Sequence, residues 1–385
     1  MPELDRFDSS AARPTSTPTV SVVVPTYCEV ENLPALVGRL AAVRAQQGYE
    51  LDLWIVDDDS RDGTESAIAA LSLPWLHLVV RSEEHGMTRG LSLAVLEGLR
   101  RAQGEVLVVM DADLSHPPET LPAMLDALLD GADFVVGSRF VAGGTTDDDW
   151  GIFRFLNSRI ATLLALPLTT ISDPMSGYFM LRRSTFEAGG DYDPIGYKIG
   201  LELYVKCGCR NAVEVPIHFA DRRRGESKLS LREQLRYLVH IRRLYMYRFE
   251  VVSQLLHFLL VGASGLLVNL AVLTALMALG LGFAWAMGGA IALSMVWNFA
   301  LNRRFSFSYA HQTSALRQFI GFVTACSVGA LVNYLVALWV LDWVGYPQLA
   351  ATVGVISATG FNFSASRLYV FKQRHVVDKG GIKHS

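Results

Sequence analysis

Two long stretches of this chain carry almost no charge. No Asp, Glu, Lys or Arg occurs from residue 251 to residue 302, and Asp342 is the one charged residue from 318 to 366. Each stretch has about 50 residues, enough for two membrane-crossing helices of roughly 20 residues and a short turn. The pattern predicts four transmembrane helices, near 254–277, 283–302, 317–340 and 348–369. The alternative is a buried soluble bundle, which uncharged runs of this length disfavour.

The rest of the chain has an ordinary charge content. The sequence has 34 Lys and Arg and 37 Asp and Glu, and only five of these lie in residues 251–371. The others are spread over the remaining sequence at a density typical of a soluble domain. The net charge of −3 argues against a nucleic-acid partner, because such proteins normally carry a basic excess. The composition therefore predicts a soluble domain followed by a membrane domain.

The basic residues near the predicted spans indicate an orientation. They lie between the second and third spans and after the fourth: Arg303, Arg304, Arg317, Lys372, Arg374 and Lys379. These positions predict a multi-pass protein of the plasma or inner membrane. The positive-inside rule places its soluble domain and both termini in the cytoplasm. Residues 1–18 contain no apolar run, so we interpret them as a disordered tail, and 373–385 as a cytoplasmic tail.

The membrane half repeats itself at a constant sequence offset. The matching pairs are Gly265 and Gly329, Asn269 and Asn333, Asn298 and Asn362, Arg303 and Arg367, and Phe307 and Phe371. This self-similarity predicts two copies of one helical hairpin. The asparagines have two interpretations, hydrogen bonding between helices or part of a substrate pathway, and the first is the more ordinary one.

The soluble half alternates β-branched runs with helical patterns. The predicted strands are 20–25, 51–57, 76–81, 106–110 and 134–137, and the predicted helices are 31–45, 64–71, 89–102 and 118–129. This alternation predicts an α/β fold with a mostly parallel sheet, in which ligands bind at the carboxyl ends of the strands.

Acidic side chains follow the predicted strand 106–110. Asp111 and Asp113 could converge on a hard divalent ion such as Mg²⁺ or Mn²⁺, which prefers oxygen ligands. Two acids at a strand end can also be solvated or can cap a helix, and Ser115 could cap the following one. The pair alone therefore leaves both interpretations open.

Taken together, the motifs resemble those of family 2 glycosyltransferases with a Rossmann-like GT-A fold, and within that family the dolichyl- or polyprenyl-phosphate mannose synthases. The matching blocks run in order through residues 20–230: 22–29, 56–64, 110–119, 137–140, 173–180, 196–202, 214–217 and 221–230. The repeated hairpins in 250–372 resemble the GtrA-like family of four-helix membrane domains. We expect a GT-A domain over 19–228.

The resemblance implies roles for individual residues. The nucleotide sugar would contact Pro25, Tyr27, Glu29, Val56, Asp57, Asp58, Asp111, Ala112, Asp113, Arg139, Arg222 and Lys228, with Asp57 or Asp58 at the base or ribose. Asp111, Asp113 and Ser115 would hold the divalent metal. Asp113, Arg139, Arg154 and Ser158 would act in catalysis, the last two near the acceptor phosphate. The chain departs from the family pattern at Cys28, where Asn is usual, and at Ser92, where a second glycine is usual.

Two further segments predict contact with a membrane surface. Residues 152–170 are apolar with a thin basic face, and 229–249 combine an apolar stripe with five arginines. Both patterns are typical of helices in the membrane interface, with ordinary core helices as the alternative.

The sequence thus predicts an inverting transfer of one sugar, mannose from GDP-mannose by preference, to dolichyl or polyprenyl phosphate. The implied partners are this nucleotide sugar, the lipid phosphate, the bilayer and a possible second copy of the chain. A UDP-glucose enzyme of the same architecture is one alternative. A non-catalytic lipid-sugar flippase or scaffold is another, which the intact Asp111, Asp113, Arg139 and Lys228 disfavour.

Overall fold

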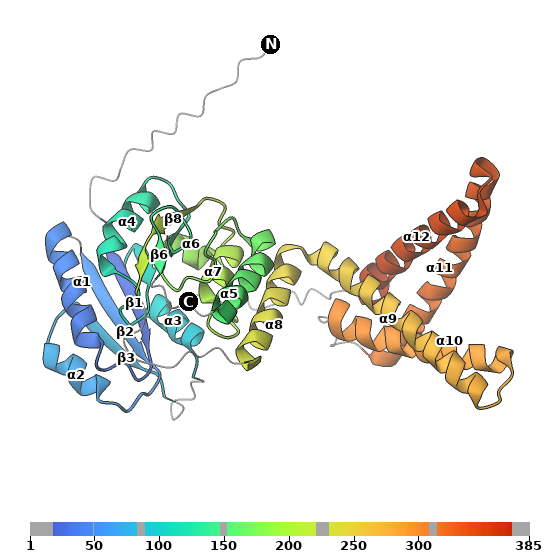
Figure 1. Ribbon diagram of the computed structural model, residues 1–385, viewed down its shortest axis with the longest axis horizontal. Coiled ribbons are helices and arrows are strands. Elements are labelled where there is room, and N and C mark those ends of the chain that lie inside the picture. Colours follow the sequence, from blue (N-terminus) through green and yellow to red (C-terminus); the bar gives the residue numbers. More distant parts are fainter. Residues whose placement is uncertain are drawn as a thin grey trace, which may run out of the picture. The chain divides into compact units, whose positions relative to one another are not determined.

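The computed structural model describes residues 18–48, 50–82, 89–146, 152–220, 231–307 and 314–371. It divides into two compact units, Met1–Arg248 and Phe249–Ser385, which are described separately (Figure 1). The predicted tails lie outside the described residues, apart from Pro18.

A seven-stranded sheet forms the centre of the first unit. Its order is β3-β2-β1-β4-β7-β5-β8, and neighbouring strands are parallel except at β7, which runs antiparallel to β4 and β5. The strands are β1 (Val20–Thr26), β2 (Leu51–Asp57), β3 (Leu76–Val80), β4 (Val106–Val109), β5 (Phe134–Ser138), β7 (Phe179–Arg182) and β8 (Ala212–Pro216). The five predicted strands are all present, whereas the prediction contained neither β7 nor β8.

Helices cover both faces of this sheet (Figure 1). They are α1 (Leu33–Gln47), α2 (Thr64–Leu71), α3 (Leu91–Arg101), α4 (Leu121–Leu129), α5 (Ile152–Ala165), α6 (Arg183–Ala188), α7 (Ile199–Lys206) and α8 (Leu231–Arg248). Short 3-10 turns precede α4 (Pro118–Thr120) and follow α5 (Leu166–Leu168), and β6 (Thr145–Thr146) pairs with β9 (His218–Phe219). The segments expected to be interfacial, 152–170 and 229–249, are therefore largely helical.

Strand β1 is the centre of the core because water reaches neither of its faces. All seven residues are buried, and Val22 and Val24 pack in one cluster with α1 and α4. On the opposite face α3 comes unusually close, since a Cβ added to Gly98 would lie 2.3 Å from Cγ1 of Val23. Such two-sided burial explains why apolar residues lie on both faces of the strand instead of alternating with polar ones.

The strand order creates a crevice beside β1. The chain runs from β1 outward through β2 and β3, then returns to place β4 on the other side of β1. In open α/β sheets, ligands bind at such a switch point, outside the carboxyl ends of the strands. Here those ends lead into Tyr27, Asp58 and Asp111.

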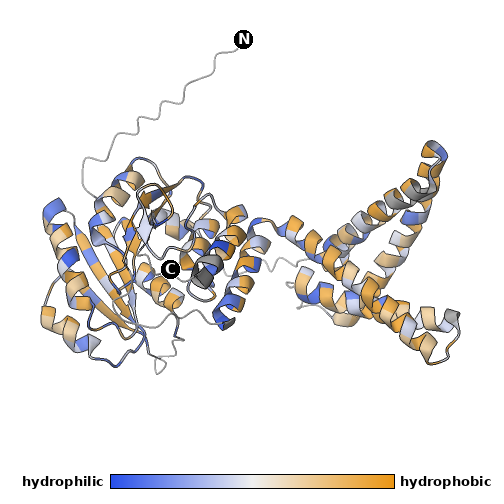
Figure 2. Ribbon diagram, in the orientation of Figure 1, coloured by the Kyte–Doolittle hydropathy of each residue, from blue (hydrophilic) through white to orange (hydrophobic). Residues whose placement is uncertain are grey.

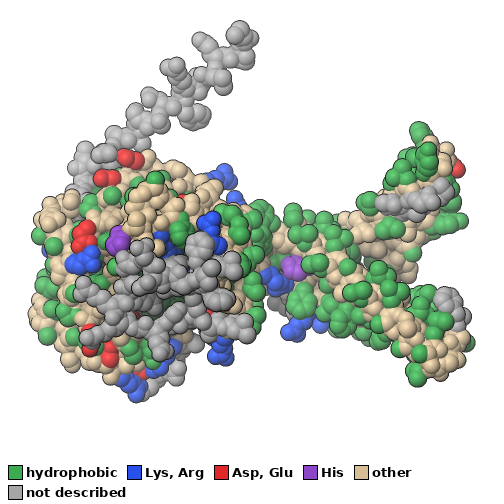
Figure 3. Space-filling model, in the orientation of Figure 1, with side chains coloured by type: hydrophobic (Ala, Val, Ile, Leu, Met, Phe, Trp, Pro, Cys, Tyr) green, Lys and Arg blue, Asp and Glu red, His purple; other side chains and the backbone are tan. Residues whose placement is uncertain are grey.

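The second unit consists of long apolar helices. They are α9 (Glu250–Ala278), α10 (Phe283–Leu301), α11 (Ala315–Val344) and α12 (Pro347–Ala365), with α9 packed on α10 and α11 on α12. Hydrophobic residues predominate along these helices (Figure 2), and hydrophobic side chains are exposed over much of the face seen in Figure 3. Helices α9 and α11 are long and apolar enough to cross a membrane, whereas spanning by α10 and α12 stays a prediction.

The structure of this unit reproduces the repeat found in the sequence. A Cβ added to Gly265 would lie 2.0 Å from Oδ1 of Asn298, and one added to Gly329 would lie equally close to Oδ1 of Asn362. Each glycine therefore lets the second helix of its hairpin bring an asparagine against the first. The helices α10 and α12 both end in a π-helical turn, Asn302–Ser306 and Ser366–Val370.

The two hairpins are also joined reciprocally. Nε of Arg303 donates to Oε1 of Gln318 at 2.8 Å, and Nε of Arg367 donates to Oε1 of Gln254 at the same distance. The two buried glutamines are separated by the same offset as the two arginines, so each repeat supplies both a donor and an acceptor. Between the repeats, the buried rings of Phe307 and Phe371 stack with their centroids 4.7 Å apart.

Candidate active site

A cavity of about 900 Å³ opens at the carboxyl ends of β1, β2 and β4. Its walls continue along α3 and α5, the loop before β7, and the adjacent ends of α7 and α8. This size is typical of a small-molecule site. The charged and polar side chains that line it include Tyr27, Glu29, Asp58, Arg89, Asp111, Asp113, His116, Arg139, Asn157, Ser158, Ser176, Tyr197, Lys198, Glu233 and Arg236.

Two carboxylates lie at the floor of the cavity, directly after β4. Asp111 is 28% exposed, and its carboxyl oxygens lie against Gly177, where an added Cβ would come within 3.2 Å. Asp113 is more buried, and its Oδ1 accepts hydrogen bonds from the amide and the hydroxyl of Ser115 at 3.1 and 2.5 Å. Ser115 therefore orients Asp113 from behind, and its hydroxyl lies outside the cavity lining.

His116 supports this acidic pair from inside the protein. Its Nδ1 accepts the backbone N–H of Asp111 at 3.0 Å, and its ring stacks on Tyr178 with centroids 5.3 Å apart. Burial lowers the pKa of His116, so a neutral imidazole fits this place. An imidazole whose Nδ1 is occupied in this way fixes the backbone of the acidic turn.

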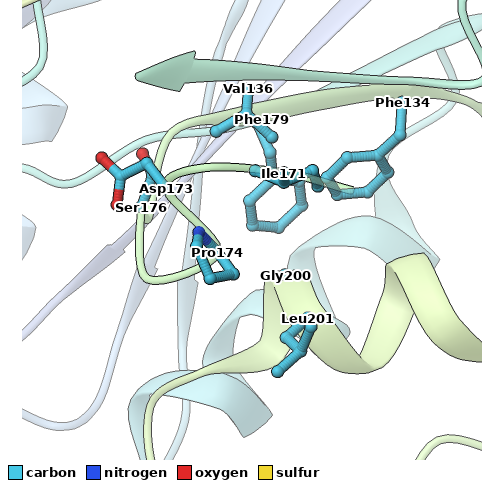
Figure 4. A pocket seen from close by; sticks show the side chains of 9 residues that line it. All are labelled: Phe134, Val136, Ile171, Asp173, Pro174, Ser176, Phe179, Gly200 and Leu201. Atoms are coloured by element: carbon cyan, nitrogen blue, oxygen red, sulfur yellow. The ribbon is translucent and has the colours of Figure 1, made fainter. Parts of the chain in front are cut away.

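Arg139 is held by a carboxylate that the sequence analysis did not single out. Asp173 is fully buried and accepts from Nε and Nη2 of Arg139, each at 2.7 Å, and from its backbone N–H at 3.2 Å. In Figure 4 the Asp173 carboxylate points away from the apolar side chains of Phe134, Ile171 and Phe179, which pack behind its loop. Bidentate pairing of this kind fixes the plane of a guanidinium.

The loop that carries Asp173 is itself anchored from two sides. Glu214 on β8 accepts the backbone N–H groups of Ser172 and Asp173 at 2.8 and 3.0 Å. Nζ of Lys198, at the start of α7, donates to the carbonyl of Met175 at 2.8 Å. The position of Arg139 therefore depends on a chain of contacts that runs from the sheet to the cavity.

Asp57 and Asp58, at the end of β2, are tied into the protein by different partners. Asp57 accepts from the hydroxyls of Thr26 and Ser60 and does not line the cavity. Asp58 lines the cavity and accepts from the Gly90 amide at 2.7 Å and from Arg81. Burial raises the pKa of Asp58 above its ordinary value in spite of these partners.

The turn after β1 brings Tyr27 and Glu29 to the same end of the cavity. Cys28, between them, adopts φ +59° and donates its N–H to Oγ of Ser60 at 2.8 Å. Asparagine tolerates this left-handed conformation better than most residues, which explains why it is usual at this position. With cysteine at this position, the hydrogen bond to Ser60 stabilises the turn.

The far end of the cavity is built by α5 and α8. Asn157 and Ser158 of α5 line it, together with Glu233 and Arg236 of α8. The tyrosine hydroxyls of α8 dock this helix on α5, because Tyr237 donates to the carbonyl of Ala161 at 2.7 Å and Tyr245 to that of Leu164 at 3.0 Å.

Most of the predicted site residues come together in this cavity. Those that line it are Pro25, Tyr27, Glu29, Asp58, Asp111, Ala112, Asp113, Arg139 and Ser158. Val56, Asp57 and Ser115 lie behind the lining, and their direct roles stay predictions. Arg222, Lys228 and the side chain of Arg154 lie outside the described residues.

The two carboxylates fit a divalent cation only in part. Among the described residues, no group of three His, Cys, Asp or Glu side chains is arranged to hold a metal. Asp111 and Asp113 both face the cavity, and Mg²⁺ is commonly held by one or two carboxylates while substrate phosphates and water supply the other ligands. The residues present therefore suit a cation that arrives with a phosphorylated ligand.

Comparison with known proteins agrees with this architecture. Residues 21–190 match the family described as Glycosyl transferase family 2, and residues 257–371 match the GtrA/DPMS transmembrane domain. A Pyrococcus furiosus protein named dolichol-phosphate mannosyltransferase is 38% identical over 90% of this chain and 98% of its own length.

Two shorter relatives cover less of the chain. A Saccharomyces cerevisiae protein, also named dolichol-phosphate mannosyltransferase, is 41% identical over 60% of this chain and 88% of its own length. A Mycolicibacterium smegmatis polyprenol monophosphomannose synthase is 37% identical over 58% of this chain and 84% of its own length. With the full-length match, these similarities confirm the resemblance inferred from the motifs. The chain belongs to glycosyl transferase family 2, in the group of dolichol-phosphate mannosyltransferases that carry a GtrA/DPMS transmembrane domain.

Proposed function

We propose that this protein transfers mannose from GDP-mannose to a polyprenyl phosphate and produces a β-linked lipid-phosphate mannose. The observation that carries the proposal is the cavity itself, which is lined by Tyr27 and Asp58, where the nucleotide would bind, by the acidic pair and by Ser158 on α5. A donor diphosphate and an acceptor phosphate could therefore meet beside Asp111 and Asp113. The names of the three relatives agree with this reaction.

The charges of the cavity suit departure of a nucleoside diphosphate. Arg139 is oriented by Asp173 before the substrate binds, so it can stabilise developing negative charge without reorganisation. Asp111 and Asp113 would hold Mg²⁺ or Mn²⁺, which when bound neutralises charge on the leaving diphosphate.

The acceptor needs little help from a general base, because a phosphate monoester is already an anion at neutral pH. The histidine nearest the acids agrees with this, since Nδ1 of His116 is taken by the Asp111 amide and only 2% of its side chain is exposed. We place the acceptor phosphate beside Ser158 and Asn157, with Arg154 as a further contact. Attack from that end of the cavity, opposite the nucleotide, would invert the anomeric centre.

A lipid substrate also requires the cavity to lie at a membrane. Leu163 on α5 is 63% exposed, and Leu235 and Leu238 on α8 are 56% and 49% exposed. We propose that these side chains rest in the bilayer interface and that α8 leads directly into the spanning helix α9. Both termini and the first unit would then lie on the cytoplasmic side, so thiol reagents that do not cross the membrane should label single cysteines placed in them in opened cells but not in intact cells.

A donor screen with purified full-length protein tests the reaction. We expect organic-extractable product from GDP-mannose, polyprenyl phosphate and Mg²⁺ or Mn²⁺, and far less from UDP-glucose. Asp113→Asn should abolish product formation. Asp133→Asn is the matched control and should not, because Asp133 does not line the cavity and accepts two backbone N–H groups instead. Product from UDP-glucose alone would favour the glucosyl alternative, and no product from any donor would favour a non-catalytic role.

A further inference from the structure

A guanidinium lies over an exposed aromatic ring at the nucleotide end of the cavity. The Tyr27 side chain is 44% exposed, and Cζ of Arg89 lies 5.7 Å from the centroid of its ring. Both residues line the cavity. Arg89 immediately precedes Gly90, whose amide donates a hydrogen bond to Asp58. This contact fixes the position of the Arg89 backbone.

The Arg89 side chain is oriented by an acidic neighbour. Its Nη2 donates to Oδ2 of Asp59 at 3.3 Å, and the same oxygen accepts from Arg61 at 3.0 Å. Arg61, and to a smaller extent Arg89, holds the pKa of Asp59 below its ordinary value, so this anchor is an anion at neutral pH. A guanidinium has five N–H donors, and the contact with Asp59 leaves donors that can face the cavity.

This end of the cavity therefore presents both a hydrogen-bond acceptor and a hydrogen-bond donor. Asp58, when ionised, is purely an acceptor, and Arg89 is purely a donor. Guanine matches such a pair, because N1–H and the 2-amino group are donors while O6 and N7 are acceptors. In DNA recognition, arginine paired with O6 and N7 of guanine is the commonest specific contact between a side chain and a base, and the same two acceptors are present in GDP. Adenine presents an amino group in place of O6, and uracil has no N7.

We propose that Arg89 selects the base of the donor by donating hydrogen bonds to O6 and N7 of guanine. The inference rests on the proposed use of GDP-mannose and adds the residue that discriminates guanine from other bases. Asp59 and the ring of Tyr27 hold the guanidinium in place for this contact.

Direct binding of nucleotides to the full-length protein tests the proposal without requiring turnover. The ligands are GDP, ADP and 7-deaza-GDP, in which a carbon replaces N7, and the readout is displacement of a fluorescent GDP analogue. A bidentate contact of this kind gives roughly ten- to hundredfold discrimination between bases. For the wild type we therefore expect GDP to bind at least tenfold more tightly than either analogue.

Arg89→Met keeps an apolar stem over Tyr27 but removes the donors. It should weaken the binding of GDP roughly tenfold or more and leave the affinity for ADP unchanged. The difference in affinity between GDP and 7-deaza-GDP should disappear. Arg89→Lys keeps the charge without the planar fork and should also lose the 7-deaza discrimination. The matched control is Arg61→Met, since Arg61 contacts the same Asp59 but does not line the cavity, and it should keep the wild-type order.

Three results would overturn the proposal. An equal loss for all three nucleotides in Arg89→Met would make Arg89 a general phosphate or stacking contact. Unchanged discrimination in both Arg89 variants would place base selection elsewhere. The same collapse in Arg61→Met would assign the effect to the Asp59 loop. Failure of mannosyl transfer with intact guanine selectivity would instead refute the proposed reaction and leave this inference standing.

Discussion

The contact between Asp173 and Arg139 gives the sharpest quantitative prediction. Asp173→Asn keeps the shape of the side chain but removes its charge, and it places an amide donor against one of the two guanidinium nitrogens that now donate to it. Neither side chain has much access to water, since Asp173 is 0% and Arg139 10% exposed. Solvent therefore cannot replace the lost partner.

The expected cost follows from these contacts. Hydrogen bonds to charged groups contribute about 1.5–3 kcal/mol each, and removal of one partner of a buried ion pair costs about 3–5 kcal/mol. If about 3 kcal/mol of this cost falls on the transition state, kcat drops by roughly a hundredfold. The KM for GDP-mannose should change much less, because Arg139 is proposed to act on charge that develops as the diphosphate leaves.

The assay is steady-state mannosyl transfer by full-length protein, with circular dichroism to check folding. Arg139→Gln and the double variant complete a mutant cycle. If the two residues act as one unit, the double variant should be no slower than the worse single variant, so the two losses should not add. Asp133→Asn serves as the control, because it removes the charge of a carboxylate that accepts backbone N–H groups elsewhere. Retention of kcat within threefold by a folded Asp173→Asn protein would refute the reasoning.

Three further predictions concern packing and the membrane. Gly265→Ala should lower the stability of the full chain in detergent by about 1–3 kcal/mol, because its Cβ would meet Asn298. The control, Gly262→Ala, should be neutral because the space around Gly262 is open. Equal melting temperatures for the two variants would contradict this prediction. Gln318→Leu should cost about 1.5–3 kcal/mol by removing one hydrogen-bond partner of Arg303, and a wild-type melting temperature would show that this contact contributes nothing. Leu163→Glu should raise the KM for long polyprenyl phosphates roughly tenfold but not for a short soluble acceptor, since burial of a leucine contributes about 1.5–3 kcal/mol. Ala70→Glu, on the exposed part of α2, is its control, and an equal effect on both acceptors would exclude a membrane contact.

The parallel part of the sheet could be predicted because its inner strands β1 and β4 are buried along their whole length. Apart from Ser21 and Thr26, β1 is apolar, and the polar turns after β1, β2 and β4 mark the same edge of the sheet. Convergence of Tyr27, Asp58 and Asp111 then follows from parallel pairing alone. The edge that binds ligand is therefore predictable without knowledge of any long-range contact.

The antiparallel strand β7 could not be predicted in the same way. It is short, and its place between β4 and β5 depends on pairings with strands that lie far before it in the chain. The contact of Asp173 with Arg139 also joins residues distant in sequence. Local pattern carries no signal for such a pair, although both residues lie in motif blocks of the family.

In the membrane unit, the sequence repeat also contains a signal for the contact between the two hairpins. The repeat offset relates Gln254 to Gln318 as it relates Arg303 to Arg367. The sequence therefore contained all four partners of the reciprocal contact, and only the pairing across repeats needed the structure. The two long uncharged stretches, in contrast, located all four helices to within several residues.

The most direct test of the account is the identity of the product formed by the purified full-length protein. GDP-mannose labelled with ¹³C at the anomeric carbon is supplied with polyprenyl phosphate and Mg²⁺ in lipid vesicles, and the organic extract is analysed by mass spectrometry and NMR. The account predicts a single mannose joined through a β-linkage to the lipid phosphate. An α-linked product, a chain of several sugars, or an organic extract without label would contradict it.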